Sequence, residues 1–243
     1  MIRIGVAGIA GRMGRIVAPL VVDAPDLQLA GGTIRPGSTP PPEPWWPELL
    51  TDRPEELAAA CDVVIDFSSP ESALAHAAAC AAHGCRLVSG TTGFDARQSA
   101  ELDARSAAIP VFHAANFSLG IAALRQALRS LAVTLATYDV AVIETHHTAK
   151  RDAPSGTALL LAQAVEEARG ATPAVDLHSL RLGGQPGRHT VIFAAGDEEV
   201  SITHQAFGRR AYAAGALLAA RFLLRQPPGR YGIDHLLADL AGN

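Results

Sequence analysis

The sequence lacks the features that mark secreted, membrane-spanning and nucleic-acid-binding proteins. It holds three cysteines among 243 residues, an odd number without CxxC spacing, which argues against a disulfide framework and a cysteine metal site. No apolar run reaches the roughly 18 residues that a membrane span needs. The net charge of −4 offers no excess of basic residues for nucleic acid or anionic lipid. We therefore expect a cytoplasmic protein that has neither nucleic acid nor membrane as a partner.

The chain does hold enough apolar sequence to bury a substantial core. Hydrophobic residues make up 49% of it and charged residues 18%, and 243 residues suit one large domain or two modest ones. Residues 1–7, MIRIGVA, are typical of a strand and not of a signal peptide. Cys61, Cys80 and Cys85 are expected to be buried as small hydrophobic side chains, and no metal site is expected.

Short apolar strands alternate with helices along the first half of the chain. The run DVVIDF around residues 63–66 is typical of a buried parallel strand. A proline-rich loop, 36–47, is the only compositionally biased segment and is too short to link two domains. The alternation predicts an α/β fold with a doubly wound, Rossmann-type parallel sheet. Its expected strands are 2–7, 27–31, 63–66, 86–89 and 110–113, and its expected helices are 12–22, 70–82 and 96–107.

The pattern changes after residue 117. Strands there follow one another without intervening helices, which predicts a second, α+β domain with a largely antiparallel sheet. The expected strands are 139–144, 178–182, 189–194 and 199–205, and the expected helices are 119–132, 156–168 and 211–224. The last helix is apolar on most sides, so we expect it to pack back against the first domain. We assign residues 1–117 plus 208–243 to a dinucleotide-binding domain and residues 118–207 to a substrate-binding domain.

Gly8, Gly11 and Gly14 give a GxxGxxG spacing between the first expected strand and the first expected helix. Glycines at such a turn let backbone N–H groups approach a pyrophosphate, and the positive end of the following helix attracts the anion. A glycine-rich turn that binds no ligand would show the same spacing. The strand-to-helix context favours dinucleotide binding.

The end of the second expected strand bears on the choice of cofactor. A site specific for NAD usually has an acidic residue there for the ribose 2′-hydroxyl. Residues 32–35 contain none, and Arg35 is available to bind a 2′-phosphate, although a solvated arginine at a strand end is also common. We therefore expect NADPH in preference to NADH. Loops 66–69, 90–92 and 114–117 follow strands of the same sheet and are expected at its ligand-binding carboxyl edge.

The run 144–157, ETHHTAKRDAPSGT, concentrates ionisable side chains between a strand and a helix. His146 and His147 can exchange protons near neutral pH. Lys150 is a cation and, when partly desolvated, a proton donor. The first turn of the helix, 156–157, offers N–H groups and a hydroxyl that suit a small carboxylate.

Three other interpretations of this run are weaker. Adjacent histidines project in different directions and no third ligand stands at a usual spacing, which argues against zinc. Ser155 lacks the GxSxG elbow of a serine hydrolase and suits a helix cap after Pro154. A polar surface loop with incidental histidines leaves unexplained why two histidines, a lysine and a helix N-terminus converge. Together with the nucleotide-binding half, the run predicts a reductase whose substrate is a small acid such as a dicarboxylate.

At these residues the chain resembles the 4-hydroxy-tetrahydrodipicolinate reductases, also called dihydrodipicolinate reductases, of lysine and diaminopimelate biosynthesis. The run from Glu144 to Ala158 matches the signature of that family throughout. The resemblance extends over most of the chain. Supporting matches, in the expected order, are Gly8–Gly14 with Arg12 and Met13, Asp66–Ser68, Gly90–Phe94, Ala114–Phe117 and Ile202–His204.

The resemblance implies a division of roles among these residues. His146 would be the proton donor or acceptor and Lys150 the proton donor. His147, Gly156 and Thr157 would hold the substrate carboxylates. The residues implied for the cofactor are Gly8, Ile9, Ala10, Gly11, Arg12, Met13, Arg35, Gly90, Thr91, Thr92, Ala114, Ala115, Asn116 and Phe117.

The resemblance also implies the reaction, a hydride transfer from NAD(P)H to ring C4 of the dehydrated cyclic dicarboxylate that gives tetrahydrodipicolinate. Family members form homotetramers through the sheet of the second domain, so residues 118–207 would also form the oligomer contacts. Many members have an acidic residue where this chain has Ile34, which favours NADPH here. The segment 170–190 is short, and Arg188 stands where an acidic residue is common, which bears on closure of the substrate loop.

Two competing functions are a dinucleotide-sensing regulator and a related reductase that acts on another small acid. A regulator would need an added DNA-binding or partner module, for which neither the length nor the charge of the chain leaves room. A related reductase would differ only in the substrate that it consumes.

Overall fold

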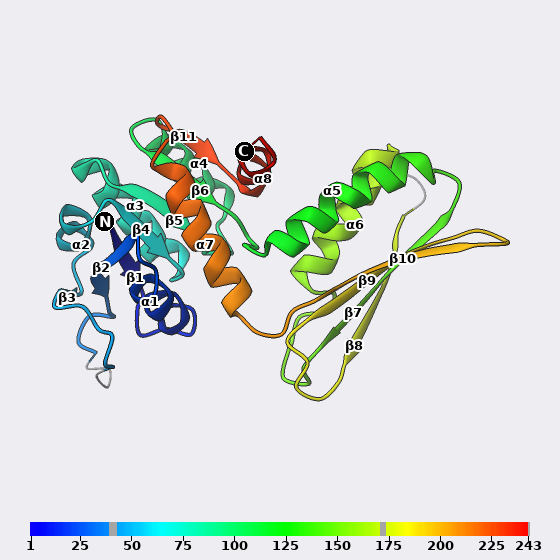
Figure 1. The fold of residues 1–243 in the computed structure, drawn as a ribbon, viewed down its shortest axis with the longest axis horizontal. Helices are drawn as coiled ribbons and strands as arrows, with labels where there is room; N and C mark the ends of the chain where they lie inside the picture. Colours follow the sequence, from blue (N-terminus) through cyan, green and yellow to red (C-terminus); the bar gives the residue numbers. More distant parts are fainter. Residues whose placement is uncertain (39–42, 171–173, 243) are drawn as a thin grey trace. The chain divides into compact units, whose positions relative to one another are not determined.

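The structure is a computed structural model that describes residues 1–38, 43–170 and 174–242. The chain divides into two compact units (Figure 1). Unit 1 comprises Met1–Phe117 and Arg210–Asn243, and unit 2 comprises Ser118–Arg209. The chain thus leaves unit 1 after Phe117, and it returns at Arg210, two residues beyond the expected start of the returning segment at 208.

Unit 1 is built on a parallel sheet, which confirms the predicted α/β fold. Its strands are β1 (Ile2–Ala7), β2 (Leu27–Thr33), β3 (Leu50–Thr51), β4 (Val63–Asp66), β5 (Arg86–Ser89), β6 (Pro110–His113) and β11 (Gly229–Tyr231). They lie in the order β11-β6-β5-β4-β1-β2-β3, and every neighbouring pair is parallel. The central strand β4 is buried at each of its residues, as its continuous apolar sequence predicts.

Helices cover this sheet in two groups. They are α1 (Gly14–Val22), α2 (Pro54–Ala60), α3 (Pro70–His83), α4 (Ala96–Ser106), α7 (Arg210–Leu223) and α8 (Ile233–Ala241). α1 contacts α7, while α3 contacts both α2 and α4. α7, drawn in orange in Figure 1, packs on β5 and β6, as its nearly all-round apolar sequence predicts.

Some short elements of unit 1 differ from the expectation. β3, α2, β11 and α8 have no counterpart among the expected elements, so α7 is not the last helix. β3 and β11 are too short to show a periodic pattern, and their strand geometry depends on pairing with β2 and β6. α1 begins at Gly14 and not near Arg12, because residues before it form a tight turn. Of the proline-rich loop, residues 39–42 lie outside the described residues.

Unit 2 is an α+β unit, as predicted. Its elements are α5 (Leu119–Thr134), β7 (Asp139–His146), α6 (Gly156–Arg169), β8 (Asp176–Arg181), β9 (Arg188–Ala194) and β10 (Glu199–Gln205). The strand order is β10-β9-β7-β8, with β9 antiparallel to both neighbours and β8 parallel to β7. Side chains of α5 and α6 form a core with the sheet, among them Leu128, Leu161, Val142, Val191 and Phe193. Residues 171–173, within the segment noted as short, lie outside the described residues.

The strand before the predicted catalytic run is longer than predicted. The strand expected over 139–144 continues to His146, so this histidine lies on β7 and not in the following loop. The alternating burial of β7 explains the extension, because Glu144 and His146 continue the buried face that Val140 and Val142 begin.

The cysteines and the helices bear on two expectations drawn from the composition. The three cysteines are free and buried in unit 1, and burial raises the pKa of the Cys61 thiol to about 12. None of the helices in the described part of the chain is both long and apolar enough to cross a membrane.

Candidate functional site

The turn after β1 is tight and glycine-dependent. Gly8 has a φ of +68°, in the left-handed region, and its N–H donates to the Thr33 hydroxyl at 3.2 Å. The N–H of Ile9 donates to the carbonyl of Thr33 at 3.0 Å, and that of Gly11 to the carbonyl of Gly8 at 2.8 Å. These bonds fold the loop back against the end of β2.

α1 begins directly against this turn. A Cβ on Gly14 would lie 2.4 Å from the carbonyl oxygen of Gly8 and 2.6 Å from the Cα of Ile9, so only glycine fits. Gly11 and Arg12 are exposed in the turn just before the helix. An exposed glycine turn at a helix N-terminus, with a cation beside it, fits the phosphates of a dinucleotide.

A buried histidine supports the same turn from within unit 1. His76 Nδ1 lies 2.7 Å from the Ser72 carbonyl, and because a carbonyl can only accept, Nδ1 is the donor. Nε2 on the other side of the ring is hydrogen-bonded to the Thr33 hydroxyl at 3.1 Å, and the oxygen of that hydroxyl accepts from the Gly8 N–H. Sequence analysis missed His76, because it lies in the middle of a helix without a motif around it.

A second network joins the loops after β4 and β5. The carboxylate of Asp66 is fully buried and accepts from the hydroxyls of Ser68, of Ser89 at 3.0 Å and of Thr91 at 2.7 Å. The Ser68 N–H donates to the Thr91 hydroxyl at 3.0 Å. The carbonyl of Thr91 is 2.9 Å from His113 Nε2, at the end of β6. These bonds fix two neighbouring loops and the end of β6 at the carboxyl edge of the sheet.

The cofactor candidates all follow β1, β2, β5 or β6, strands whose carboxyl ends lie along one edge of the parallel sheet. They differ in exposure. Exposed members, which can contact a ligand directly, are Gly11, Arg12, Arg35, Thr92 and Ala115. Buried members, whose side chains help to shape the loops, are Ile9, Thr91, Ala114 and Phe117. Half-buried members are Gly8, Ala10, Met13, Gly90 and Asn116.

In unit 2 the central feature is a buried carboxylate, Glu144. It is fully buried on β7, two residues before His146, and the two side chains lie on the same face. His146 Nδ1 is hydrogen-bonded to Glu144 Oε2. Since the carboxylate accepts, Nδ1 carries the proton, which leaves Nε2 as the nitrogen that can exchange a proton with a substrate.

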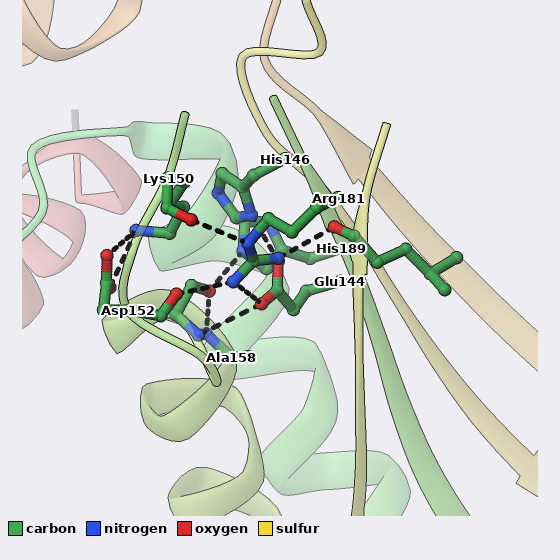
Figure 2. Close-up of polar contacts among 9 residues, drawn as sticks. Glu144, His146, Lys150, Asp152, Ala158, Arg181 and His189 are labelled. Atoms are coloured by element: carbon green, nitrogen blue, oxygen red, sulfur yellow. Dashed lines mark hydrogen bonds and ion pairs between the residues drawn. The ribbon is translucent and has the colours of Figure 1, made fainter. Parts of the chain in front are cut away.

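Arg181, the last residue of β8, lies directly beside this pair in register with His146. Its Nη1 donates to Glu144 Oε2 at 3.0 Å, and its Nη2 is 2.9 Å from Oε1. Its Nε donates to the Lys150 carbonyl at 3.2 Å and its Nη2 to the Asp152 carbonyl at 2.5 Å. Figure 2 shows the guanidinium between the carboxylate and the loop that carries Lys150.

These contacts determine the charge of Glu144. Burial alone would raise the pKa of the carboxyl, but hydrogen bonds from Arg181, His146 and Ser179 outweigh it and lower the pKa to about 2. Glu144 is therefore ionised at any pH near neutrality, and a permanent negative charge faces His146 Nδ1.

Lys150 and Asp152 form an ion pair in the loop after β7. Both carboxylate oxygens of Asp152 lie 2.8 Å from Lys150 Nζ, and this hydrogen bond lowers the pKa of Asp152. The Lys150 side chain is 19% exposed, so its ammonium keeps some access to solvent. His147, the neighbour of His146, is half-buried, and its carbonyl accepts from the Lys150 N–H at 3.1 Å.

The N-terminus of α6 lies beside the carboxylate of Glu144. Ser155 caps the helix, since its hydroxyl accepts from the Ala158 N–H at 3.1 Å, and its own N–H donates to Glu144 Oε1 at 3.2 Å. Gly156 is exposed, and an added Cβ there would meet nothing within 4 Å. Thr157 is half-buried on the same turn. The first turn of α6 therefore has open space in front of it and suits an anion.

A second buried histidine, His189 of β9, completes the cluster. Its ring centre is 5.1 Å from that of His146, and its Nε2 is 3.1 Å from the Ser155 hydroxyl. Burial, together with the charge of a protonated His146, lowers the pKa of His189 to about 4, so it is neutral near pH 7. Within the described residues, no group of three or more His, Cys, Asp and Glu side chains is placed to hold a metal ion.

Of the predicted residues, the structure brings His146 onto Glu144 directly and the main chain at Lys150 to it through Arg181, and it adds residues that were not predicted. No such link to Glu144 is seen for His147, Gly156 or Thr157 among the contacts described above. Arg181 and His189 come from strands distant in the sequence, and nothing near either residue resembles a motif. One signal was available for Arg181. Glu144 continues the buried face of an apolar strand, and a buried carboxylate needs a cation or several donors.

Comparisons with known proteins agree with this arrangement. The family model described as Dihydrodipicolinate reductase, N-terminus, matches residues 2–117, and the one described as Dihydrodipicolinate reductase, C-terminus, matches residues 120–237. The second match runs past unit 2 into α7, β11 and α8, so it is not confined to one structural unit.

Proteins of similar sequence carry one enzyme name. A 4-hydroxy-tetrahydrodipicolinate reductase of Thermomicrobium roseum is 45% identical, over 98% of this chain and 100% of its own. One of Myxococcus xanthus is 40% identical, over 100% of this chain and 98% of its own. The fold is similar to that of a dipicolinate-bound dihydrodipicolinate reductase from a Paenisporosarcina species, with a TM-score of 0.82 at 23% identity, covering 96% of this chain and 97% of that one.

Proposed function

This chain belongs to the dihydrodipicolinate reductase family, and from that membership we propose which of its residues carry the reaction. The chain is an NAD(P)H-dependent oxidoreductase that acts as a 4-hydroxy-tetrahydrodipicolinate reductase in lysine and diaminopimelate biosynthesis. It reduces a cyclic dicarboxylate, with loss of water, to tetrahydrodipicolinate. Bound NAD(P)H supplies the hydride, so the protein has to bind the dicarboxylate and supply or accept protons.

We assign the proton transfer of the reaction to His146 and Lys150. The observation that carries this proposal is the bond from His146 Nδ1 to the ionised, buried Glu144, which fixes the ring and leaves Nε2 for proton exchange. Lys150 is the proton donor beside it, on a loop held to the same carboxylate through Arg181. Its partner Asp152 keeps the ammonium in place before substrate binds.

The substrate carboxylates are assigned to His147, Gly156 and Thr157. The support is the first turn of α6, where the open space at Gly156 lets an anion approach the backbone N–H groups. Thr157 and His147, both half-buried, would supply a hydroxyl and an imidazole as further polar contacts for the carboxylates. Unit 2 is accordingly the substrate-binding unit and unit 1 the dinucleotide-binding unit.

NADPH is the proposed cofactor in preference to NADH. The fourteen cofactor candidates include Arg35, which is exposed just after β2, and residues 32–35 contain no carboxylate to hold a ribose 2′-hydroxyl. The fit is supported by the turn after β1, where Gly8 has a left-handed φ of +68° and a Cβ on Gly14 would clash with the backbone of Gly8 and Ile9. Turnover with each cofactor tests the preference, and Arg35→Ala should lower kcat/KM for NADPH by about tenfold while leaving that for NADH unchanged.

The proposed assembly is a homotetramer formed by the sheet of unit 2. Exposed apolar side chains on and beside β8 support it, since Leu180 is 45% exposed and Leu182 58% exposed. A single species at four times the chain mass in light scattering is the expected result. The cytoplasm is the proposed location, because the three cysteines are free thiols.

The central test is an absorbance assay of NADPH oxidation with the cyclic product of aspartate-semialdehyde and pyruvate condensation. His146→Asn and Lys150→Met should each lower kcat by about 10² or more. Cofactor affinity, measured by fluorescence titration, should stay within about twofold, because both residues lie in unit 2. Full activity in Lys150→Met would overturn its role, and binding of cofactor without its oxidation would point to a sensor.

A further inference from the structure

Arg181 uses nearly its whole donor set inside the cluster around Glu144. Its guanidinium forms hydrogen bonds to Glu144 Oε2 at 3.0 Å, to the carbonyls of Lys150 at 3.2 Å and Asp152 at 2.5 Å, and to that of Leu180 at 2.8 Å. A further ion-pair contact reaches Glu144 Oε1 at 2.9 Å. Its side chain is 20% exposed and that of Glu144 1%, so these bonds form largely away from water.

The acceptors of Arg181 belong to two parts of the chain that the proposed reaction needs together. Glu144 holds His146 through Nδ1, and the Lys150 carbonyl belongs to the loop that carries the second proton-moving side chain. The Lys150 N–H is already held by the His147 carbonyl at 3.1 Å. With its carbonyl held by Arg181 as well, the main chain at Lys150 is fixed on both sides.

We propose that Arg181 is a positioning residue of the reaction, because one guanidinium fixes both the carboxylate that orients His146 and the backbone that carries Lys150. This inference rests on the proposed roles of His146 and Lys150. Arg181 itself needs no contact with substrate or cofactor. Its effect is to keep two proton-moving groups, one on a strand and one on a loop, at a constant separation.

The geometry requires arginine and not merely a positive charge. A guanidinium donates in several fixed directions within one plane, whereas a lysine ammonium is a compact point charge. A lysine at this position can neutralise Glu144 but cannot also reach the carbonyls of Lys150 and Asp152. Arg181→Lys therefore separates the charge of the residue from its bridging role.

A second arginine of unit 2 provides a matched control. Arg169, at the end of α6, donates to the carbonyls of Leu135 at 2.6 Å and Ala132 at 3.4 Å and lies over the Phe193 ring at 5.7 Å. It joins α6 to the end of α5 in the way that Arg181 joins β8 to the loop, but it contacts none of the proposed catalytic residues. Arg169→Lys should therefore lower stability and leave kcat unchanged within about twofold.

The experiment measures kcat, both KM values and thermal stability of the full-length protein for Arg181→Lys, Arg181→Ala and Arg169→Lys. Arg181→Lys should lower kcat by roughly 10- to 100-fold, as misplacement of a catalytic group does, with the KM for each substrate within about twofold. Added guanidinium ion should restore part of the kcat of Arg181→Ala, and it should have no such effect on His146→Asn or Lys150→Met. A purely structural role would not produce that selective rescue.

The outcomes separate this inference from the function on which it rests. If His146→Asn and Lys150→Met are inactive but Arg181→Lys keeps kcat within about twofold, the proposed function stands and the positioning role is overturned. If the loss in Arg181→Lys disappears once activity is expressed per folded molecule, as expected for Arg169→Lys, the role is likewise overturned. If His146→Asn and Lys150→Met remain active, the proposed function itself fails.

Discussion

Each unit of the protein is organised around one buried carboxylate, and the two carboxylates are satisfied in different ways. Asp66 of unit 1 accepts from the hydroxyls of Ser68, Ser89 and Thr91. Glu144 of unit 2 accepts from a guanidinium, a histidine ring, a backbone N–H and one serine side chain, so it alone of the two has a cationic donor. Both are fully buried.

The two sets of donors suit the two carboxylates to different roles. A hydroxyl can donate or accept, so the network around Asp66 can rearrange while it holds loops together. A guanidinium only donates, so the network around Glu144 requires two accepting oxygens and holds a fixed charge. The first arrangement suits loops that shape a cofactor site, and the second suits the orientation of a group that moves protons.

The largest expected effect comes from Glu144→Gln. Both oxygens of Glu144 face Arg181, so the amide nitrogen lies against a donor in either orientation. The half-buried guanidinium loses its counter-charge, and we expect a loss of about 3 kcal/mol in the free energy of unfolding, with kcat lowered by about 10². Denaturant unfolding and steady-state kinetics measure these quantities. Wild-type stability in this variant would show that the charge of Glu144 is unimportant.

The next effect appears in acid and concerns His189. Its folded-state pKa of about 4 lies below the ordinary 6.5, so the unfolded chain binds more protons between these values. The stability that goes with a neutral, buried His189 is fully present above about pH 6.5. It is lost as the pH falls towards 4, which lowers the free energy of unfolding by about 3 kcal/mol. Glu144, with its pKa near 2, stays ionised over this range.

The test is the free energy of unfolding measured from neutral pH down to about pH 4 for the wild type and for His189→Gln. The glutamine keeps an amide near the Ser155 hydroxyl but does not titrate. Its stability should fall less steeply in acid than that of the wild type. Equal slopes would mean that another group causes the acid loss.

Alanine substitutions at two glycines, one in each unit, compare how closely the backbone is packed there. Gly14→Ala places a Cβ 2.4 Å from the Gly8 carbonyl oxygen, a backbone atom that cannot move aside as a flexible side chain can. We therefore expect a loss of about 2 kcal/mol in the free energy of unfolding and weaker binding of NADPH. In the control, Gly156→Ala, the Cβ meets nothing within 4 Å, so stability is kept. The added methyl should raise only the KM for the dicarboxylate. Calorimetry and steady-state kinetics of both variants test this contrast. A loss of stability in Gly156→Ala would contradict it.

The smallest effect is expected for Asp66→Asn. Its partners are hydroxyls, which can rotate to accept from the new amide, so we expect a loss of only about 1 kcal/mol. Comparison with Glu144→Gln by denaturant unfolding tests the contrast directly. Equal losses in the two variants would remove the distinction between the two carboxylates.

Much of the fold follows from patterns that are local in the chain. The continuous apolar run of β4 indicates a parallel sheet, and the glycine spacing before α1 indicates a tight turn. β3, α2, β11 and α8 were not predicted. For β3 and β11 the reason is that such short segments gain strand geometry only by pairing with distant strands.

The chemical groups of the site can be identified from the amino-acid sequence alone. The run from Glu144 to Thr157 supplies a carboxylate, two histidines, a lysine and a helix cap, and alternation along β7 decides that Glu144 and His146 share its buried face.

The partners of those groups, in contrast, depend on the three-dimensional packing of the chain. Arg181 and His189 reach Glu144, His146 and Ser155 through the register of β7 with β8 and β9, and Thr33 reaches His76 across unit 1. Such pairings depend on how strands and helices pack over long sequence separations, which no local pattern encodes. They also decide which of these groups is charged, because burial and hydrogen bonding set the pKa of a side chain.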